Sequence, residues 1–245
     1  MSIHSQVQKL NEMIAGSQRF VVFTGAGISA ESGIPTYRGD DGLWHSYDPS
    51  KYADFTHFQQ DSSYYWHFFQ EVRYPVIQNA RPNKAHEVLA RLQEKGTLSA
   101  IITQNIDGLH QEAGAGKVLE LHGNTRRIFC LNCGIDYTMT SVFTMLSTQL
   151  PPKCGECGGA LRPGVVFFGE SLPAAVLDEA VKETEACDLF LVVGSSLVVQ
   201  PAAGLPVMAK RNRAKVVIVN REPTPLDTMA DLVMHSTASD VLGAL

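Results

Sequence analysis

Four of the five cysteines fall in two pairs whose spacing is typical of a metal site. The pairs are Cys130-x2-Cys133 and Cys154-x2-Cys157, and twenty residues separate them. Two such knuckles can point four thiolates at one tetrahedral zinc ion. Because protein sulfur would fill every coordination position, the spacing predicts a closed structural zinc site and not a catalytic one. Cys187 stands alone, and we expect it in the core.

A glycine-rich loop follows the first apolar run of the chain. Residues 25–30, GAGISA, match the pattern G-x-G-x-x-G/A directly after the strand-like RFVVFT. Glycines at Gly25 and Gly27 permit a tight turn and a close approach of backbone N–H groups to a pyrophosphate. Such a loop is also found as a purely structural turn from a strand to a helix.

Two later apolar runs end in polar residues that could contact the same ligand. VGSS and VNRE follow core-like strands, at the strand ends where open α/β sheets place their ligands. The residues expected to contact phosphate or ribose are Gly194, Ser195, Ser196, Asn220, Arg221 and Glu222. On this local pattern, Arg221 leaves a cofactor with a 2′-phosphate open.

A third strand end combines an amide pair, an acid and a histidine. TQNIDGLH contains Gln104, Asn105 and Asp107, and the following LELHGN contains His122. These groups could handle a ribose hydroxyl and a carboxamide, so we interpret them as catalytic candidates. Other histidines are expected to be structural; they are His57, His67, His86, His110 and His235.

Apolar runs that alternate with helical segments must position these groups. Strands are expected at 19–24, 98–104, 117–122, 188–194, 215–220 and 231–235, and helices at 84–96, 173–188 and 201–213. Near-continuous hydrophobic strands predict a mostly parallel sheet that is covered on both faces, in a Rossmann-like α/β architecture. Residues 1–39, 83–124 and 165–245 would form this domain, and 40–82 and 125–164 a small domain with a helical module and a zinc ribbon.

Composition limits the functional classes. The chain has 245 residues, 44% of them hydrophobic and 18% charged, with a net charge of -5. This composition predicts a globular protein without the electrostatic footprint of a nucleic-acid binder. No apolar run approaches a membrane span, and the first residues lack the apolar segment of a signal peptide, so we expect a cytoplasmic protein.

Taken together, the motifs resemble those of the sirtuins, which are NAD-dependent protein lysine deacylases. The resemblance covers nearly the whole chain and rests on GAGISAESGIPTYRG, TQNIDGLH, LHGN, the cysteine pairs, RPGVVFFGE, GSSLVVQPA and VNREPTPLD. It implies a Rossmann domain and a small zinc-containing domain, with NAD and an acetyl-lysine peptide entering the cleft between them from opposite sides. It also implies NAD and not NADP.

The same resemblance implies roles for individual residues. Asp107 would hold the nicotinamide carboxamide, His122 would act as a general base through the ribose hydroxyls, Asn105 would assist water, and Gln104 would position the ribose. Nicotinamide, 2′-O-acetyl-ADP-ribose and free lysine would be the products. Further cofactor contacts are implied at Ala26, Ile106 and Ala238 and in the segment 31–44, a lid over nicotinamide that includes Glu31, Tyr37, Arg38 and Trp44; Tyr37 stands where the family more often has Phe.

The substrate is expected to bind as an extended strand between residues 164–170 and 196–202. The expected contacts are Val166, Phe167, Phe168, Gly169, Glu170, Leu197 and Val198. Sirtuins that prefer succinyl-lysine share a Tyr-x-x-Arg pair, and this chain has Phe69 and Val72 at those places. With Arg73 expected on the surface, the sequence predicts removal of acetyl and other neutral acyl groups and weak activity on succinyl-lysine. Three other functions stay open as alternatives to a deacylase: a mono-ADP-ribosyltransferase, an NAD-dependent dehydrogenase and a non-catalytic zinc-ribbon binding module.

Overall fold

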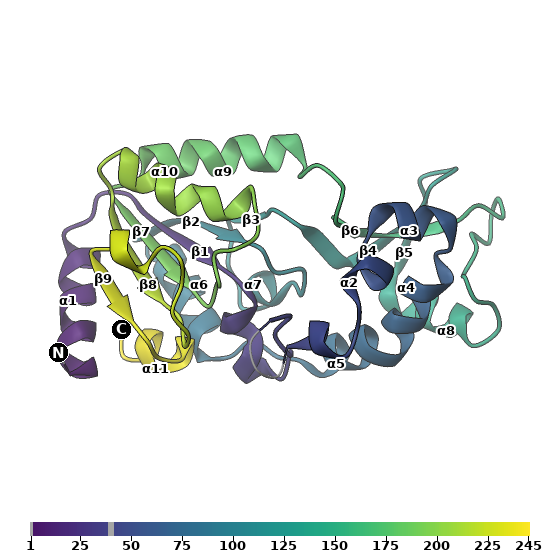
Figure 1. Cartoon of the computed structure of the whole chain (residues 1–245), viewed down its shortest axis with the longest axis horizontal. Coiled ribbons are helices and arrows are strands. Elements are labelled where there is room, and N and C mark those ends of the chain that lie inside the picture. Colours follow the sequence, from purple (N-terminus) through teal and green to yellow (C-terminus); the bar gives the residue numbers. More distant parts are fainter. Residues whose placement is uncertain (1, 39–41) are drawn as a thin grey trace.

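The computed structural model describes residues 2–38 and 42–245. A six-stranded parallel sheet lies at the centre of its larger module (Figure 1). The strand order is β3-β2-β1-β7-β8-β9, and all neighbouring pairs are parallel. The strands are β1 (Phe20–Thr24), β2 (Leu98–Thr103), β3 (Val118–Glu120), β7 (Leu189–Val193), β8 (Lys215–Val219) and β9 (Leu232–Met234). All six expected strands are therefore confirmed.

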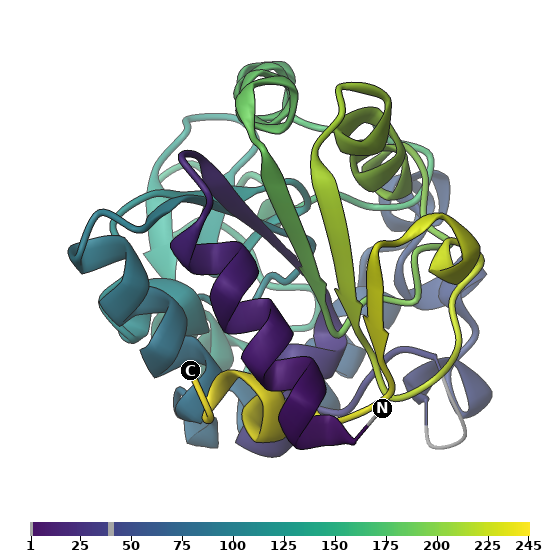
Figure 2. The ribbon, with the colours of Figure 1, turned by 90° about the vertical axis from the view of Figure 1, so that its left-hand side faces the viewer.

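Helices cover both faces of this sheet (Figure 2). Phe20 and Val22 of β1 pack toward α1 (Ile3–Ala15), α6 (Lys84–Glu94) and α11 (Ala238–Leu242). Val21 and Phe23 pack on the opposite face, toward α9 (Ala174–Ala186) and α10 (Leu205–Arg211). Burial on both faces explains why β1 and β7 are apolar at every position. The predicted doubly covered α/β architecture is confirmed.

A second, smaller module lies at the other end of the molecule (Figure 1). It contains an antiparallel sheet of order β5-β4-β6 and a group of short helices around one aromatic core. Its elements are η2 (Leu43–His45), α2 (Pro49–Tyr52), α3 (Phe55–Gln60), α4 (Ser63–Phe68), η3 (Phe69–Arg73), α5 (Tyr74–Asn79), β4 (Gly123–Cys130), β5 (Asp136–Thr138), α8 (Met139–Leu146) and β6 (Leu161–Val165). The predicted boundaries at 124/125 and 164/165 fall inside β4 and β6, and the division into two domains stays a prediction.

Short elements complete the connections. They are η1 (Ala26–Ser32), α7 (Leu109–Glu112), η4 (Ala202–Gly204) and η5 (Asp227–Met229). The helix after the glycine loop, η1, is a 3-10 helix. None of the helices within the described residues is long and apolar enough to cross a membrane.

A π-helical turn interrupts the helical run between Ser63 and Asn79. It is η3, and it joins α4 directly to α5. Pro75 follows in the first turn of α5 and has no N–H to offer to an upstream carbonyl. The wider turn changes the rotation per residue relative to a regular α-helix, and Arg73 is its last residue.

Candidate functional site

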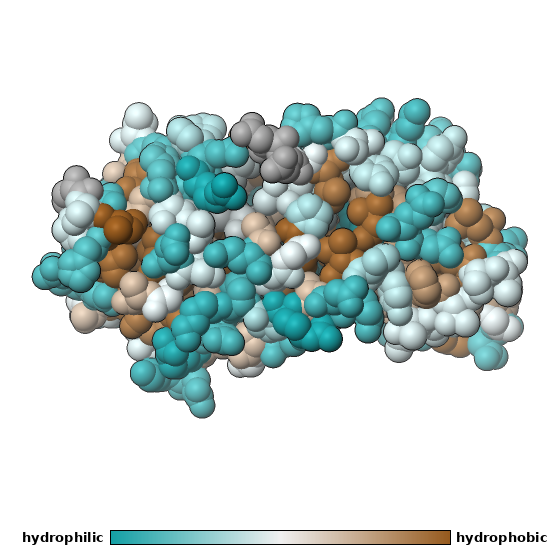
Figure 3. Space-filling model, turned by 90° about the horizontal axis from the view of Figure 1, so that it is seen from below, coloured by the Kyte–Doolittle hydropathy of each residue, from teal (hydrophilic) through white to brown (hydrophobic). Residues whose placement is uncertain are grey.

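A cleft of about 440 Å³ opens at the carboxyl ends of β1, β2, β7 and β8 and reaches the small module. We call it the main cleft. Its position between β1 and β7 is the point where the strand order reverses, at which open α/β sheets bind ligands. Figure 3 shows hydrophobic residues in the middle of the face seen from below, with further groups toward both ends of the molecule.

The glycine loop meets the end of β7 so closely that side chains cannot be accommodated. The Gly25 N–H donates to the Val193 carbonyl at 3.1 Å, and the Gly27 N–H donates to the Gly194 carbonyl at 2.8 Å. A Cβ on Gly27 would lie 2.7 Å from the Gly194 Cα, and Gly194 itself has a φ of 65°. Since the loop leaves bare backbone along the cleft, it fits the pyrophosphate of a dinucleotide.

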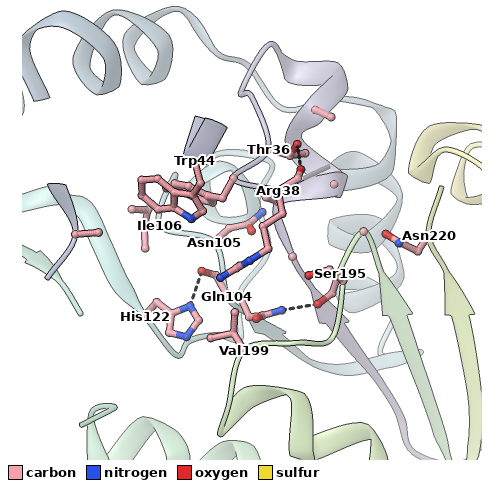
Figure 4. Close-up of a pocket in the computed structure, with 18 of the residues that line it drawn as sticks. Thr36, Arg38, Trp44, Gln104, Asn105, Ile106, His122, Ser195, Val199 and Asn220 are labelled. Carbon is pink, nitrogen blue, oxygen red and sulfur yellow. Dashed lines mark hydrogen bonds between the residues drawn. The ribbon is translucent and has the colours of Figure 1, made fainter. Parts of the chain in front are cut away.

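His122 is held at the cleft by the backbone carbonyl of Gln104, the residue that follows β2. The ring Nδ1 lies 3.0 Å from the Gln104 carbonyl oxygen (Figure 4). A carbonyl only accepts, so Nδ1 carries the proton and the lone pair of Nε2 is free. Burial lowers the pKa of His122, against the opposing effect of the Gln104 carbonyl. The imidazole is therefore a neutral base at physiological pH.

Gln104 connects this histidine to the opposite strand end. Its Nε2 donates to Ser195 Oγ at 2.7 Å (Figure 4). Ser195 follows β7, whereas Gln104 follows β2, so the bond links two strands on either side of β1. The structure thus brings together residues that the sequence places 91 positions apart.

Asn105 and Asp107 meet through a serine that the sequence analysis did not single out. Ser29 Oγ donates to Asp107 Oδ2 at 2.8 Å and accepts from Asn105 Nδ2 at 3.1 Å. The Leu109 N–H caps the other Asp107 oxygen at 2.9 Å. Burial raises the pKa of Asp107, partly offset by these hydrogen bonds. The only sequence signal for Ser29 was its place inside the glycine motif.

Asp107 lines a smaller space beside the main cleft. This side cavity of about 40 Å³ is enclosed mostly by apolar residues, with Ser29, Asn105 and Asp107 as polar groups. Its apolar and cationic wall consists of Ala26, Ile34, Pro35, Tyr37, Leu43, Val72, Arg73, Val76, Ile77 and Ile106. A flat ring with one carboxamide group suits such a lining.

The segment 31–44 contributes two aromatic rings and one cation to the main cleft. Tyr37 and Trp44 stack with ring centres 5.0 Å apart. Arg38 points from this segment toward Gln104 and His122 (Figure 4). Gly39, Asp40 and Asp41, which belong to the expected lid, lie outside the described residues.

Most of the remaining cofactor candidates line the main cleft beside β8 and α11, and one of them does not. Asn220, Arg221, Glu222 and Ala238 all line it, together with Ser236 and Thr237, which were not predicted. Glu31 is absent from the described lining of both cavities, since its carboxylate accepts from the Ser239 N–H at the start of α11, at 3.1 Å.

The expected substrate strands line the main cleft only in part. Val166, Phe167, Phe168, Gly169 and Glu170 contribute to the wall. Among the described lining residues, Leu197 and Val198 are missing: the first is buried in the core and the second is exposed.

Glu170 lines the main cleft, but its carboxylate is paired with other groups of the protein. Its carboxylate pairs with Arg162 Nη2 at 2.5 Å and accepts from the Phe167 N–H at 2.9 Å. This pair fixes the bend of the segment 166–170.

The four paired cysteines converge as their spacing predicts. Their Sγ atoms all lie within 4.8 Å of one another, with 3.5 Å between Cys130 and Cys157 and 3.6 Å between Cys133 and Cys154. Four sulfurs about 2.3 Å from a tetrahedral zinc would be separated by about 3.8 Å. The sulfur positions therefore fit zinc, and none of the four cysteines is among the described residues that line the main cleft.

A family comparison agrees with this geometry. The sequence profile of the Sir2 family matches residues 25–201. The chain belongs to the Sir2 family.

Relatives of this Sir2 protein have known names. It is 46% identical to the "NAD-dependent protein deacylase 2" of Archaeoglobus fulgidus over 98% of this chain and 94% of the relative. It is 44% identical to the "NAD-dependent protein deacetylase" of Caldivirga maquilingensis over 96% and 90% of the two chains.

Solved Sir2 structures superpose on nearly the whole chain. One, described as Sir2 bound to acetylated peptide, has a TM-score of 0.89 at 39% identity and covers 97% of this chain and 95% of its own. Another, with a deacetylated p53 peptide and 3′-O-acetyl ADP ribose, has a TM-score of 0.94 at 40% identity over 98% and 96%.

Arg73 of this Sir2 protein contradicts the sequence analysis. It lines both the main cleft and the side cavity, and its Nε and Nη1 are shielded from solvent. The prediction that Arg73 is a surface charge is therefore wrong. Arg73 is the last residue of the π turn η3, in which the rotation per residue differs from that of the regular helix assumed for the prediction.

Proposed function

We propose that this Sir2 protein is an NAD-dependent protein lysine deacetylase whose main cleft brings the two substrates together. The observation that carries the proposal is His122, a neutral buried base whose Nδ1 is fixed by Gln104, in the same cleft as the bare glycine loop. The names of the relatives, deacylase and deacetylase, support the same activity.

Residues at the carboxyl ends of the parallel strands would hold NAD. Backbone at Gly25 and Gly27 would face the pyrophosphate, Ser195 and Gln104 the nicotinamide ribose, and Asn220 the adenosine end. When bound, NAD supplies a glycosidic bond whose cleavage releases nicotinamide and makes the ribose an acceptor for the acyl group. The side cavity would receive the nicotinamide, with its carboxamide at Asp107.

His122 would remove the proton from a ribose hydroxyl with its free Nε2. Because Nδ1 is already committed to the Gln104 carbonyl, the ring cannot present the wrong tautomer. Asn105 is held by Ser29, so its amide is positioned to orient water. Tyr37 and Trp44 would shield the reacting ribose from bulk water.

The peptide would add as a strand between residues 164–170 and 196–202. Phe167, which is buried, and Val166 would form the wall for the acyl-lysine chain. Main-chain pairing of this kind demands little of the peptide sequence. The cysteine cluster would bind zinc in a structural role, since no coordination position would be left for a substrate.

Several coarser expectations belong to the same proposal. We assign residues 1–39, 83–124 and 165–245 to a Rossmann-like domain, and residues 40–82 and 125–164 to a small domain. We also expect a cytoplasmic location and no direct binding of nucleic acid. Free cysteines and the net charge of -5 support the last two. Mono-ADP-ribosyltransferase activity is not favoured by the names of the relatives.

One experiment tests the activity directly. The protein is incubated with NAD and an acetyl-lysine peptide, and the products are weighed by mass spectrometry. We expect free lysine peptide, nicotinamide and acetyl-ADP-ribose in equal amounts. ADP-ribose attached to protein would indicate the transferase, NADH absorbance a dehydrogenase, and no product a binding module.

A further inference from the structure

Arg126 holds the backbone of the loop that carries Asp107. It belongs to β4 of the small module, and its Nε donates to the Asp107 carbonyl at 2.9 Å. One residue earlier on β4, the Thr125 N–H donates to the Ile106 carbonyl, also at 2.9 Å. Two consecutive carbonyls of the loop are therefore held by two consecutive residues of one strand.

The guanidinium is itself anchored to α7, the helix that follows the loop. Its Nη2 donates to the Glu112 carboxylate. A charge-assisted pair of this kind is stronger than a neutral hydrogen bond. The contact with the loop is close, since a Cβ on Gly108 would lie 2.8 Å from the Arg126 Nε. Arg126 thus bridges β4, the loop and α7.

The side chain of Asp107 depends on the position of this backbone. Its Oδ1 accepts from the Leu109 N–H at the start of α7, and its Oδ2 accepts from Ser29 Oγ. Because both the Asp107 carbonyl and α7 are tied to Arg126, loss of the arginine would free the carboxylate to move relative to Ser29. Burial raises the pKa of Asp107, and the charge of Arg126 opposes this increase.

Arg126 is not itself part of the wall of a cavity. It is missing from the described lining of both the main cleft and the side cavity, and its side chain is 41% exposed. Ile106 and Asp107, whose carbonyls are held from β4, do line the side cavity. Any effect of Arg126 on the reaction therefore passes through these two residues.

We propose that Arg126 is a positioning residue for nicotinamide: it holds the loop 106–108 so that Asp107 can receive the carboxamide in the side cavity. The proposal rests on the proposed function, in which the side cavity receives nicotinamide. Loss of Arg126 weakens the recognition of nicotinamide much more than that of the peptide, because the peptide is expected to bind along residues 164–170 and 196–202.

The test compares the wild type with Arg126→Met, Arg126→Gln and Arg127→Met. Methionine removes both the donor and the charge, whereas glutamine keeps an N–H donor at the place of Nε without the charge. Arg127 is the next residue on β4 and pairs with the exposed Asp136, so its substitution changes the net charge equally at an adjacent position.

Two properties are measured for each protein. The deacetylation assay gives the inhibition constant of added nicotinamide and the KM of the acetyl-lysine peptide. Hydrogen exchange of the segment 104–112 is followed by mass spectrometry without any ligand, with β8 as the internal reference.

We expect the inhibition constant of nicotinamide to rise at least about fivefold in Arg126→Met, since a small displacement of a positioned group removes much of its contribution. KM for the peptide should stay within about twofold. Hydrogen exchange should become faster in 104–112 and stay unchanged in β8. Arg126→Gln should recover most of both properties, and Arg127→Met should match the wild type.

Each other outcome is decisive. An unchanged inhibition constant in Arg126→Met would overturn the proposal, whether or not hydrogen exchange changes. Equal losses in Arg126→Met and Arg126→Gln would assign the effect to the charge and refute the hydrogen bond to the loop. Faster exchange in β8 as well would reduce Arg126 to a residue that stabilises the fold. If the wild type does not turn over the peptide, the proposed function fails, and hydrogen exchange alone decides whether Arg126 holds the loop.

Discussion

The ring Nδ1 of His122 donates its proton to the carbonyl oxygen of Gln104 at 3.0 Å. This bond fixes both the tautomer and the ring plane, and it leaves Nε2 as a base that faces the cleft (Figure 4). Because Gln104 Nε2 also donates to Ser195 Oγ, one residue links His122 to Ser195, a proposed cofactor contact. The predictions for His122 follow from this arrangement.

The first prediction concerns pH. Burial lowers the pKa of His122 below its ordinary value of 6.5, so the neutral base should persist down to mildly acidic pH. We expect kcat/KM for the acetyl peptide to fall with a slope of one on the acidic side, with a midpoint below 6.5. Rates are measured from about pH 8 to about pH 5, where circular dichroism confirms folding. A midpoint above 6.5 would contradict the buried neutral base.

The second prediction separates catalysis from cofactor binding. His122→Ala should reduce deacetylation by more than about 100-fold, since positioned proton transfer contributes about that much. NAD affinity, measured by calorimetry, should change by less than about threefold, which is below 1 kcal/mol. Lost NAD binding with retained turnover would reverse the assignment of this residue.

The third prediction concerns the metal. Cys130→Ala removes one of four converging thiolates, and a structural zinc contributes directly to folding. We expect loss of zinc, measured by mass spectrometry of the metal, and a kcat/KM lower by more than about tenfold as the small module loosens. Cys187→Ala is the matched control, because it removes a buried thiol far from the cluster and should keep the zinc. A zinc-free Cys130→Ala protein with full activity would refute the structural role.

Most of the fold and part of the site could be predicted from sequence. The strands of the large sheet are apolar throughout because both faces are covered, and the cysteine spacing is a local property of two turns. Contacts that depend on tertiary packing were not visible. Ser29 reaches Asp107 across 78 positions, and Glu31 turns to the start of α11.

Arg73 shows a second reason for failure. A regular helix rotates about 100° per residue, and on that rotation Arg73 would lie on the surface. The chain instead makes a π turn at Phe69–Arg73. A prediction based on regular helical rotation therefore misplaces Arg73, the last residue of that turn.

The fourth prediction concerns acid stability. Burial lowers the pKa of His86 from 6.5 to about 4. Between pH 6.5 and about pH 4, His86 is protonated in the unfolded chain but neutral in the folded chain. The free energy of unfolding should therefore fall as the pH drops from 6.5 toward 4. The full effect of the shift is about 3 kcal/mol. Urea unfolding at several pH values measures this loss.

His86→Gln is the matched variant for that measurement. His86 occupies the third position of α6, where its ring accepts from the Asn83 N–H, and glutamine can make the same capping contact. The variant should match the wild type near pH 7.5 and lose less stability at about pH 4.5. Identical pH profiles for the two proteins would show that another group causes the acid loss.

The last prediction concerns Glu170, which the sequence analysis placed in contact with substrate. Its carboxylate accepts from Arg162 Nη2 at 2.5 Å and from the Phe167 N–H at 2.9 Å, and both side chains of the ion pair are largely buried. Glu170→Gln keeps the size but weakens both bonds, so the segment 166–170 should lose its fixed bend. Since that segment is the proposed docking edge for the peptide, KM for the peptide should rise about tenfold while KM for NAD stays within about twofold.

Glu179→Gln is the control for this measurement. It weakens an ion pair with Lys117, neither residue of which is among the described residues that line the main cleft, and it should change neither KM. Equal increases in both KM values for Glu170→Gln would mean that the pair supports the whole cleft and not the peptide edge.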